Sequence, residues 1–203
     1  MLAEIQTGEQ IRTDGTIGPP AGTRTGDIRV SDAHGRYYEA ASRGRLYIAH
    51  NTGAQAVSVA LNTTYTGLCL SNPYGSGRNL VLLGCNYALS VAPAAIASLH
   101  LIGGFSVGTA VTHTTPITNN NWSTIIGNAG SSVAKVDSAA TIPTPVYVMA
   151  MGSGFTAAAL YATTPGWIDI GGSIILQPGA FICWGALTAV TGFGSFMWEE
   201  IAI

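Results

Sequence analysis

The stretch NLVLLGCNYALSV, from Asn79 to Val91, is long and apolar and decides how the rest of the chain is interpreted. Its Leu, Val and Tyr residues favour a buried strand, and Gly84 near its middle predicts a bend there. Clusters rich in glycine, proline and asparagine separate it from other apolar segments, as residues 72–77 do on its N-terminal side. Short strands between such turns are typical of an all-β sandwich or barrel.

Further strands follow the same pattern on both sides of this stretch. Strands are predicted at residues 46–48, 56–61, 65–70, 98–105, 145–151 and 194–201. Residues 51–55 predict a hairpin-like turn between the first two, and Gln177-Pro178-Gly179 predicts a hairpin between residues 172–176 and 180–184. Residues 106–135, rich in Thr, Asn and Gly, predict a long surface excursion with short strands. We therefore expect an all-β body, a jelly-roll-like β-sandwich of two packed sheets.

The N-terminal part of the chain has a different composition. Residues 1–27 are polar and rich in turn formers, without a sustained hydrophobic period, and predict an extended arm. Residues 28–45 form a charged transition segment in which Tyr37 to Ala41 could make one helical turn. The expected organisation is therefore an arm and transition segment over residues 1–45 and a β-sandwich body over residues 46–203.

Charged residues are distributed very unevenly. The 153 residues from Leu46 to Trp198 contain only four of them, namely Arg78, Lys135, Asp137 and Asp169, whereas twelve precede Leu46. Average domains carry about 25% charged residues. A surface without charges is poorly protected against self-association, so the body suits a protein covered by its own copies or by a larger assembly. A net charge of −2 and the lack of a basic patch give no indication of nucleic-acid binding.

Two further classes of feature have a structural interpretation. Residues 80–112 are hydrophobic on average, but Asn86, Pro93 and His100 interrupt them, so no membrane-spanning helix is predicted. Each of the three cysteines lies among apolar residues and is interpreted as a small buried hydrophobic residue, and a bridge between the first two stays open. These cysteines are Cys69, Cys85 and Cys183.

Two short motifs match catalytic or phosphate-binding signatures only in part. Residues 104–108 fit G-x-S-x-G, but a polar, strand-like segment follows instead of a helix, and Asp137 comes after His113, the last histidine. Residues 75–79 lack the first glycine of a phosphate-binding loop and have Arg78 in place of its lysine. A strand end and a turn are the better interpretations.

The titratable and aromatic residues do not form a predicted site either. The histidines, which have no metal-ligand spacing and are expected to be structural, are His34, His50, His100 and His113. Lys135 and Asp137 are two apart, so in a strand they share a face and could pair with each other, and Asp169 precedes a glycine turn. Core packing is the expected role of the tryptophans, although Trp122 in an Asn-rich loop could contact a sugar. These are Trp122, Trp167, Trp184 and Trp198. We expect no catalytic, cofactor-binding or metal-binding residue.

Three phrases along the chain resemble structural proteins of tailed-bacteriophage virions. They are His34 to Ala41, Asn72 to Leu80, and the ending that runs from Ile175 to Gly179 and from Met197 to Ile201. Within that group the chain is most similar to a capsid decoration, or cement, protein. The resemblance implies a jelly-roll domain, commonly a homotrimer, on the outer capsid surface of the virion after synthesis in the host cytoplasm. It implies no enzymatic residues.

The resemblance also implies a partner, the major capsid protein, whose junctions a decoration protein bridges. Because the charged residues that could choose this partner precede Leu46, we expect assembly contacts there. They are Arg24, Asp27, Arg29, Arg36, Tyr37, Tyr38, Glu39, Arg43 and Arg45. Three alternatives remain: a tail, baseplate or fibre component of the virion, a carbohydrate-binding β-sandwich using exposed loops, and, last, an enzyme.

Overall fold

The computed structural model describes residues 35–93, 95, 97–107, 110–117, 132–151 and 166–203, and the backbone of three two-residue strands. The chain divides into two units, residues 1–38 and residues 39–203. In the first unit, β1 (Gln6–Thr7) and β2 (Ala21–Gly22) pair in parallel. The helix α1 (Tyr38–Ser42) agrees with the helical turn predicted at residues 37–41.

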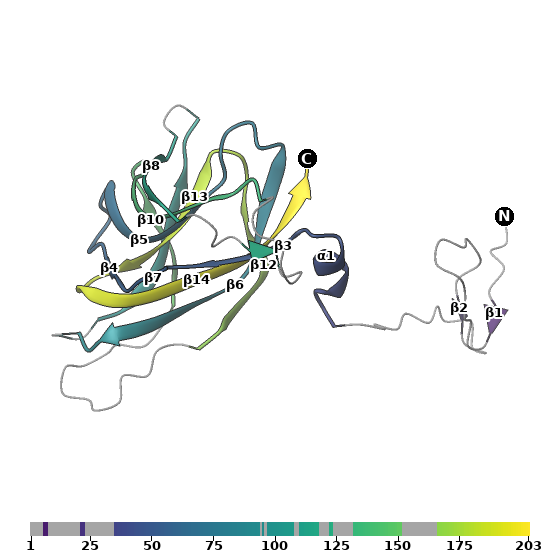
Figure 1. The fold of residues 1–203 in the computed structure, drawn as a ribbon, viewed down its shortest axis with the longest axis horizontal. Helices are drawn as coiled ribbons and strands as arrows, with labels where there is room; N and C mark the ends of the chain where they lie inside the picture. Colours follow the sequence, from purple (N-terminus) through teal and green to yellow (C-terminus); the bar gives the residue numbers. More distant parts are fainter. Residues whose placement is uncertain are drawn as a thin grey trace. The chain divides into compact units, whose positions relative to one another are not determined.

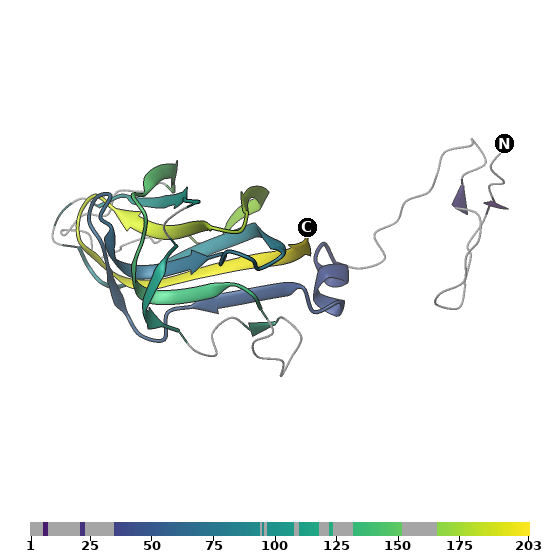
Figure 2. The same cartoon turned by 90° about the horizontal axis from the view of Figure 1, so that it is seen from above.

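The second unit is built almost entirely of antiparallel strands (Figures 1 and 2). Sheet 1 has the strand order β11-β7-β13-β5-β10-β8, and sheet 2 has the order β12-β6-β14-β3-β9, with β4 also paired to β14. This arrangement confirms the predicted all-β sandwich of two sheets. The strands are β3 (Leu46–His50), β4 (Gln55–Val57), β5 (Thr64–Ser71), β6 (Arg78–Val91), β7 (Leu99–Phe105), β8 (Thr112–Pro116), β9 (Trp122–Ser123), β10 (Lys135–Thr141), β11 (Val146–Ala150), β12 (Ile168–Leu176), β13 (Ala180–Ala186) and β14 (Val190–Ala202).

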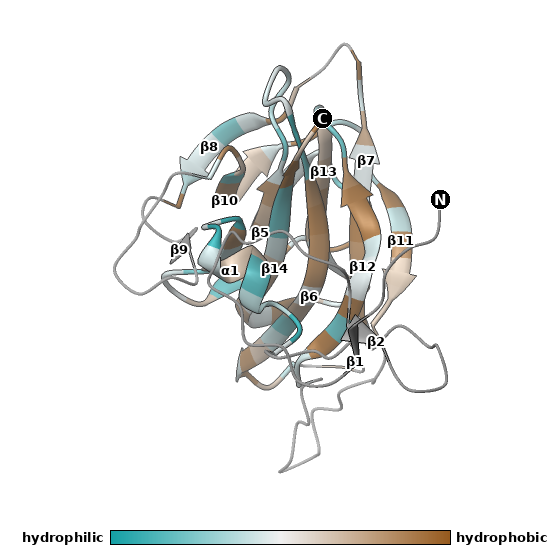
Figure 3. Cartoon of the chain, turned by 90° about the vertical axis from the view of Figure 1, so that its right-hand side faces the viewer, coloured by the Kyte–Doolittle hydropathy of each residue, from teal (hydrophilic) through white to brown (hydrophobic). Residues whose placement is uncertain are grey.

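Alternating side chains of the two sheets form the main core between them. On β14, Phe196 and Trp198 are fully buried while Met197 and Glu199 between and beside them are half-buried, which is the period of two expected of a strand. Phe196 stacks on Trp184 of sheet 1, with ring centroids 6.0 Å apart. Gly194 permits this packing, because a Cβ there would lie 2.6 Å from the Trp184 ring. Figure 3 shows the apolar residues continuing along β6, β12 and β13.

The predicted hairpin at residues 51–55 is wrong. Both β3 and β4 pair antiparallel with β14, so the chain keeps its direction through this segment instead of reversing. Asn51 is buried, and its side-chain oxygen accepts a hydrogen bond from the Gly194 amide at 2.8 Å. The turn-forming residues therefore interrupt a strand that continues in the same direction. Their composition fits such an interruption as well as it fits a chain reversal.

The second predicted hairpin has the right turn and the wrong strand pairing. β12 pairs with β6 in sheet 2, whereas β13 pairs with β5 and β7 in sheet 1. Residues 177–179 thus connect the two sheets, with the Ala180 amide donating to the Gln177 carbonyl at 2.9 Å and Gly179 at a φ of 93°. A short turn can join strands within a sheet or between sheets, and only the surrounding packing decides which.

The stretch from Asn79 to Val91 is β6, and the register between β6 and β14 shifts next to Gly84. The Trp167 ring packs so closely on Gly84 that a Cβ there would lie 2.2 Å from it. The cysteines are free and buried, with Cys85 in the main core and Cys69 and Cys183 in a smaller cluster on the other face of sheet 1. The bridge between Cys69 and Cys85 that the sequence left open is therefore not formed.

Candidate functional site

Four charged side chains gather at one end of the sandwich, where β3 begins and β14 ends. They belong to Arg45, Arg78, Glu199 and Glu200, and we call this region the charged end. The antiparallel register places Glu200 opposite Leu80 on β6, and the Glu200 amide donates to the Arg45 carbonyl at 2.9 Å. Three of the six charged residues of 46–203, namely Arg78, Glu199 and Glu200, thus lie at this end beside Arg45.

Glu200 is the buried centre of the charged end, with a relative exposure of 1%. Its Oε2 accepts a hydrogen bond from Arg78 Nη1 at 3.0 Å, while Oε1 accepts from Ser132 Oγ at 2.6 Å and from the Val133 amide at 3.0 Å. A buried carboxylate is tolerated only when it is paired and hydrogen-bonded in this way. The cluster therefore fastens residues 132–134 to the last strand.

Glu199 and Arg45 form the outer part of the charged end. Their side chains are partly exposed and approach to 3.2 Å. On α1, Glu39 and Arg43 pair one turn apart, and both are largely exposed. Exposed pairs contribute only about 0.2–1 kcal/mol to stability. Such side chains can exchange their partner for a charged group on another protein at little cost.

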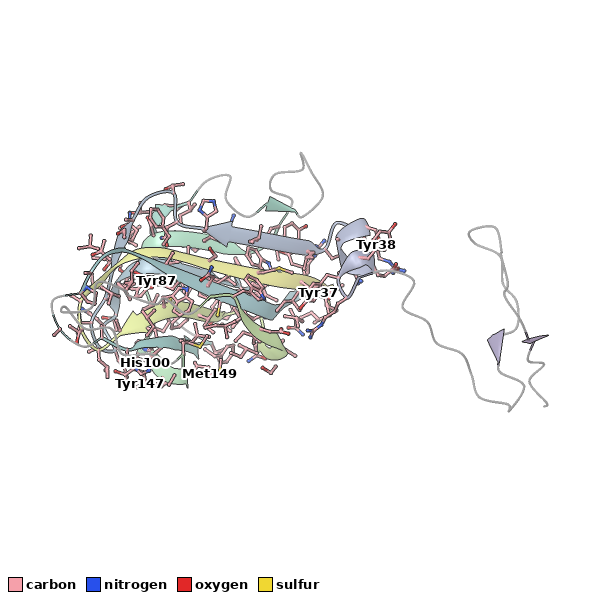
Figure 4. All side chains as sticks on the ribbon, turned by 90° about the horizontal axis from the view of Figure 1, so that it is seen from below. Tyr37, Tyr38, Tyr87, His100, Tyr147 and Met149 are labelled. Atoms are coloured by element: carbon pink, nitrogen blue, oxygen red, sulfur yellow. The ribbon has the colours of Figure 1, made fainter. Side chains whose placement is uncertain are left out.

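The predicted assembly residues are only partly placed. Arg24, Asp27 and Arg29 lie outside the described residues. In the first unit, the Arg36 guanidinium lies over the Tyr37 ring at 5.2 Å from its centroid, and Figure 4 labels both Tyr37 and Tyr38.

Sequence reasoning did not assign Glu199 or Glu200 to a site, although the structure joins them to Arg45 and Arg78. One signal was available. Alternation along the last strand predicts that two adjacent glutamates face opposite sides, one of them inward beside Trp198. Which cations they would meet depends on strand order and could not be read from the sequence.

A second polar cluster lies on the outer face of sheet 1. Asp137 on β10 is fully buried, and its Oδ2 lies 2.6 Å from Nδ1 of His113 on the edge strand β8. Lys135, the partner that the sequence allowed for Asp137, interacts with it electrostatically, whereas the hydrogen bond comes from His113, 24 residues away on a neighbouring strand. Burial raises the pKa of the Asp137 carboxyl, and the hydrogen bond from His113 opposes that shift.

His113 of this pair lines a small cavity of about 160 Å³ together with Ser71. A histidine held by a buried carboxylate is one half of a nucleophile-activating arrangement. Ser71 Oγ, however, donates to the Lys135 carbonyl at 3.3 Å. The hydrogen bond between His113 and Asp137 therefore attaches edge strand β8 to strand β10. The G-x-S-x-G match does not lie at a strand–helix elbow, since the next element described after β7 is strand β8.

The remaining sequence candidates have structural surroundings. His100 Nε2 lies 2.9 Å from Ser98 Oγ, and its ring meets Tyr147 edge-on. Trp184 and Trp198 are fully buried, as predicted for core packing, whereas Trp167 is half exposed. The side chains of His34 and Trp122 lie outside the described part of the chain.

Two searches of the structure give a negative result for the residues it describes. Within them, no three His, Cys, Asp or Glu side chains converge in a way that could hold a metal ion. No helix in the same residues has both the length and the apolar character needed to cross a membrane. Comparison with protein families, with curated proteins and with solved structures finds no match.

Proposed function

We propose that the protein is a structural component of a tailed-bacteriophage virion, of the capsid decoration type. In this role a homotrimer sits on the outside of the head and bridges subunits of the major capsid protein. The observation that carries the proposal is the charge distribution: a β-sandwich with only six charged residues over residues 46–203, three of them at the charged end, and twelve charged residues in the N-terminal segment.

We also propose that the sandwich is a jelly roll, and strand connectivity supports this. Eight strands change sheet at every step along the chain except from β7 to β11, giving the central orders β12-β6-β14-β3 in sheet 2 and β11-β7-β13-β5 in sheet 1. Two interlocked Greek keys produce this pair of orders. Strands β8 and β10 then extend sheet 1 beyond β5.

The two parts of the chain would divide the work of assembly. A neutral body can be covered by copies of itself without the cost of desolvating ions. Charged groups at the rim of a contact contribute specificity and steer association, and their effect weakens with salt. The exposed pair of Glu39 and Arg43 is suited to this second task, because breaking it costs little.

The proposal is tested by mixing purified protein with separated heads and tails of the virus and measuring co-sedimentation. We expect trimers, single or joined in pairs, that bind heads, with weaker binding as salt rises. The variant Arg43→Glu should reduce head binding, whereas Lys135→Glu, an exposed charge elsewhere on the body, should not. A monomer that ignores heads would refute the proposal, and binding to tails alone would identify a tail or baseplate component instead.

A further inference from the structure

Strand β11 is an apolar edge of sheet 1 that no other described strand covers. Its sequence is Val-Tyr-Val-Met-Ala, and all five residues are exposed, Val146 by 57% and Tyr147 by 48%. Among the described elements, β11 pairs with β7 on one side and with nothing on the other. Figure 4 labels Tyr147 and Met149 on this edge beside His100. An apolar strand with an open edge favours pairing with another chain.

The opposite edge of the same sheet is protected in the usual way. Strand β8 reads Thr-His-Thr-Thr-Pro, so its exposed residues are polar and its last residue, Pro116, cannot donate to another strand. Strand β11 has no charge and no proline, and its one irregularity is a register shift between Tyr147 and Met149. The two edges of this sheet therefore differ, because β8 has features that oppose pairing with another chain and β11 lacks them. The lack of such features is specific to β11 and is not a general property of this protein's sheet edges.

An apolar groove continues the exposed surface from β11 towards sheet 2. The groove is open, has a volume of about 470 Å³ and is lined by Val148, Phe105 and residues 174–176 of β12 among others. Phe105 is 48% exposed and Ile175 is 57% exposed. None of the groove's lining residues carries a charge. A partner that used ionic groups for recognition would find no counter-charge here.

We infer that this surface binds a second copy of the same chain, with the two β11 strands meeting antiparallel about a two-fold axis. The neutral body of the protein supplies the uncharged partner surface that the groove requires. A two-fold contact brings Val148 of both copies together and sets Val146 near Ala150, so no like charges face each other. The exposed apolar side chains offer on the order of 600 Å² per copy, near the lower limit of a specific interface of about 1,200 Å² in total.

This inference rests on the self-association in the proposed function and names a surface through which it occurs. Together with the three-fold contacts of the proposed trimer, a two-fold contact at β11 joins two trimers into a hexamer. The number of chains in the assembly is then even. Loss of the β11 contact should halve the assembly and leave each half folded, because the side chains concerned are exposed in the single chain.

The test compares Val148→Lys with Thr114→Lys, each the middle residue of an exposed edge strand of sheet 1. Mass photometry of the full chain should give an even-numbered wild-type assembly, half that mass for Val148→Lys, and the wild-type mass for Thr114→Lys. A short bis-maleimide should link Val148→Cys chains into covalent pairs and leave Thr114→Cys chains unlinked, since the native cysteines are buried.

Two results would overturn the inference: a wild-type mass that Val148→Lys leaves unchanged, or Val148→Cys chains that do not cross-link. Head binding is measured separately on the same samples. A halved mass without any head binding would uphold the β11 contact and reject the capsid role. If wild type and Val148→Lys have the same mass and both bind heads, the β11 contact is rejected and the capsid role is upheld.

Discussion

Glu200 is the residue whose removal tests most directly how this fold is held together. Its carboxylate is buried and accepts three short hydrogen bonds, from Arg78, Ser132 and the Val133 amide. The substitution Glu200→Ala removes all three acceptors. It also leaves the Val133 amide without its partner, because a main-chain group cannot turn away as a side chain can.

The expected loss follows from these contacts. Hydrogen bonds to a charged group contribute about 1.5–3 kcal/mol each, and breaking a buried ionic pair costs about 3–5 kcal/mol. Arg78 is partly exposed and can be rehydrated, so we expect the lower part of that range, about 3–4 kcal/mol. Glu200→Gln keeps the volume and one acceptor, and should lose about half as much.

The matched control is the adjacent residue. Glu199 alternates with Glu200 along β14 and pairs with Arg45, and both side chains are partly exposed, so Glu199→Ala should cost clearly less, about 1–2 kcal/mol. Urea unfolding at 25 °C, followed by tryptophan fluorescence, measures both variants, since Trp198 lies two residues from Glu200. If Glu200→Ala loses no more unfolding free energy than Glu199→Ala, the buried cluster does not anchor this end of the sandwich.

Two further predictions are tested by unfolding measurements and a third by thiol labelling. Gly192→Ala should lose about 1–3 kcal/mol, because its Cβ would lie 2.1 Å from the Ala88 carbonyl oxygen, whereas Gly53→Ala, which has open space, should change little. Because burial raises the folded-state pKa of Asp137, the folded protein holds the proton more tightly. Wild type should therefore gain stability over Asp137→Asn as the pH falls through that pKa towards 3.8, and parallel pH curves would contradict this. Burial raises the pKa of the Cys85 thiol to about 12, so a thiol reagent at pH 8 should label the protein only after unfolding, and rapid labelling of the native protein would show the core to be open.

The local pattern of the sequence predicted many of the elements correctly. β6 lies where the long apolar stretch predicts a strand, α1 overlaps the predicted helical turn, and the fully buried tryptophans are core residues as expected. These features depend on neighbours a few residues away, so a period of two or a cluster of turn formers is enough to reveal them. The concentration of charge in the first 45 residues is likewise a property of the sequence.

The failed predictions all concern which segments meet. Residues 177–179 form a turn, yet the strands they join lie in different sheets, and the sequence did not indicate that Asp137 would be hydrogen-bonded by His113 of β8. The same turn residues fit a hairpin and a connection between sheets, because turn geometry is local while strand pairing is fixed by long-range packing.

The sequence by itself determined that this protein is an all-β chain with a nearly uncharged body and a charged N-terminal segment. Only the tertiary structure decided that Glu200 is buried against Arg78, and that β11 is an open apolar edge while β8 is a polar one. The physical reason is that burial and edge position are properties of a strand's neighbours. Those neighbours are chosen by the packing of the whole sandwich, over long separations such as the 122 residues between Arg78 and Glu200.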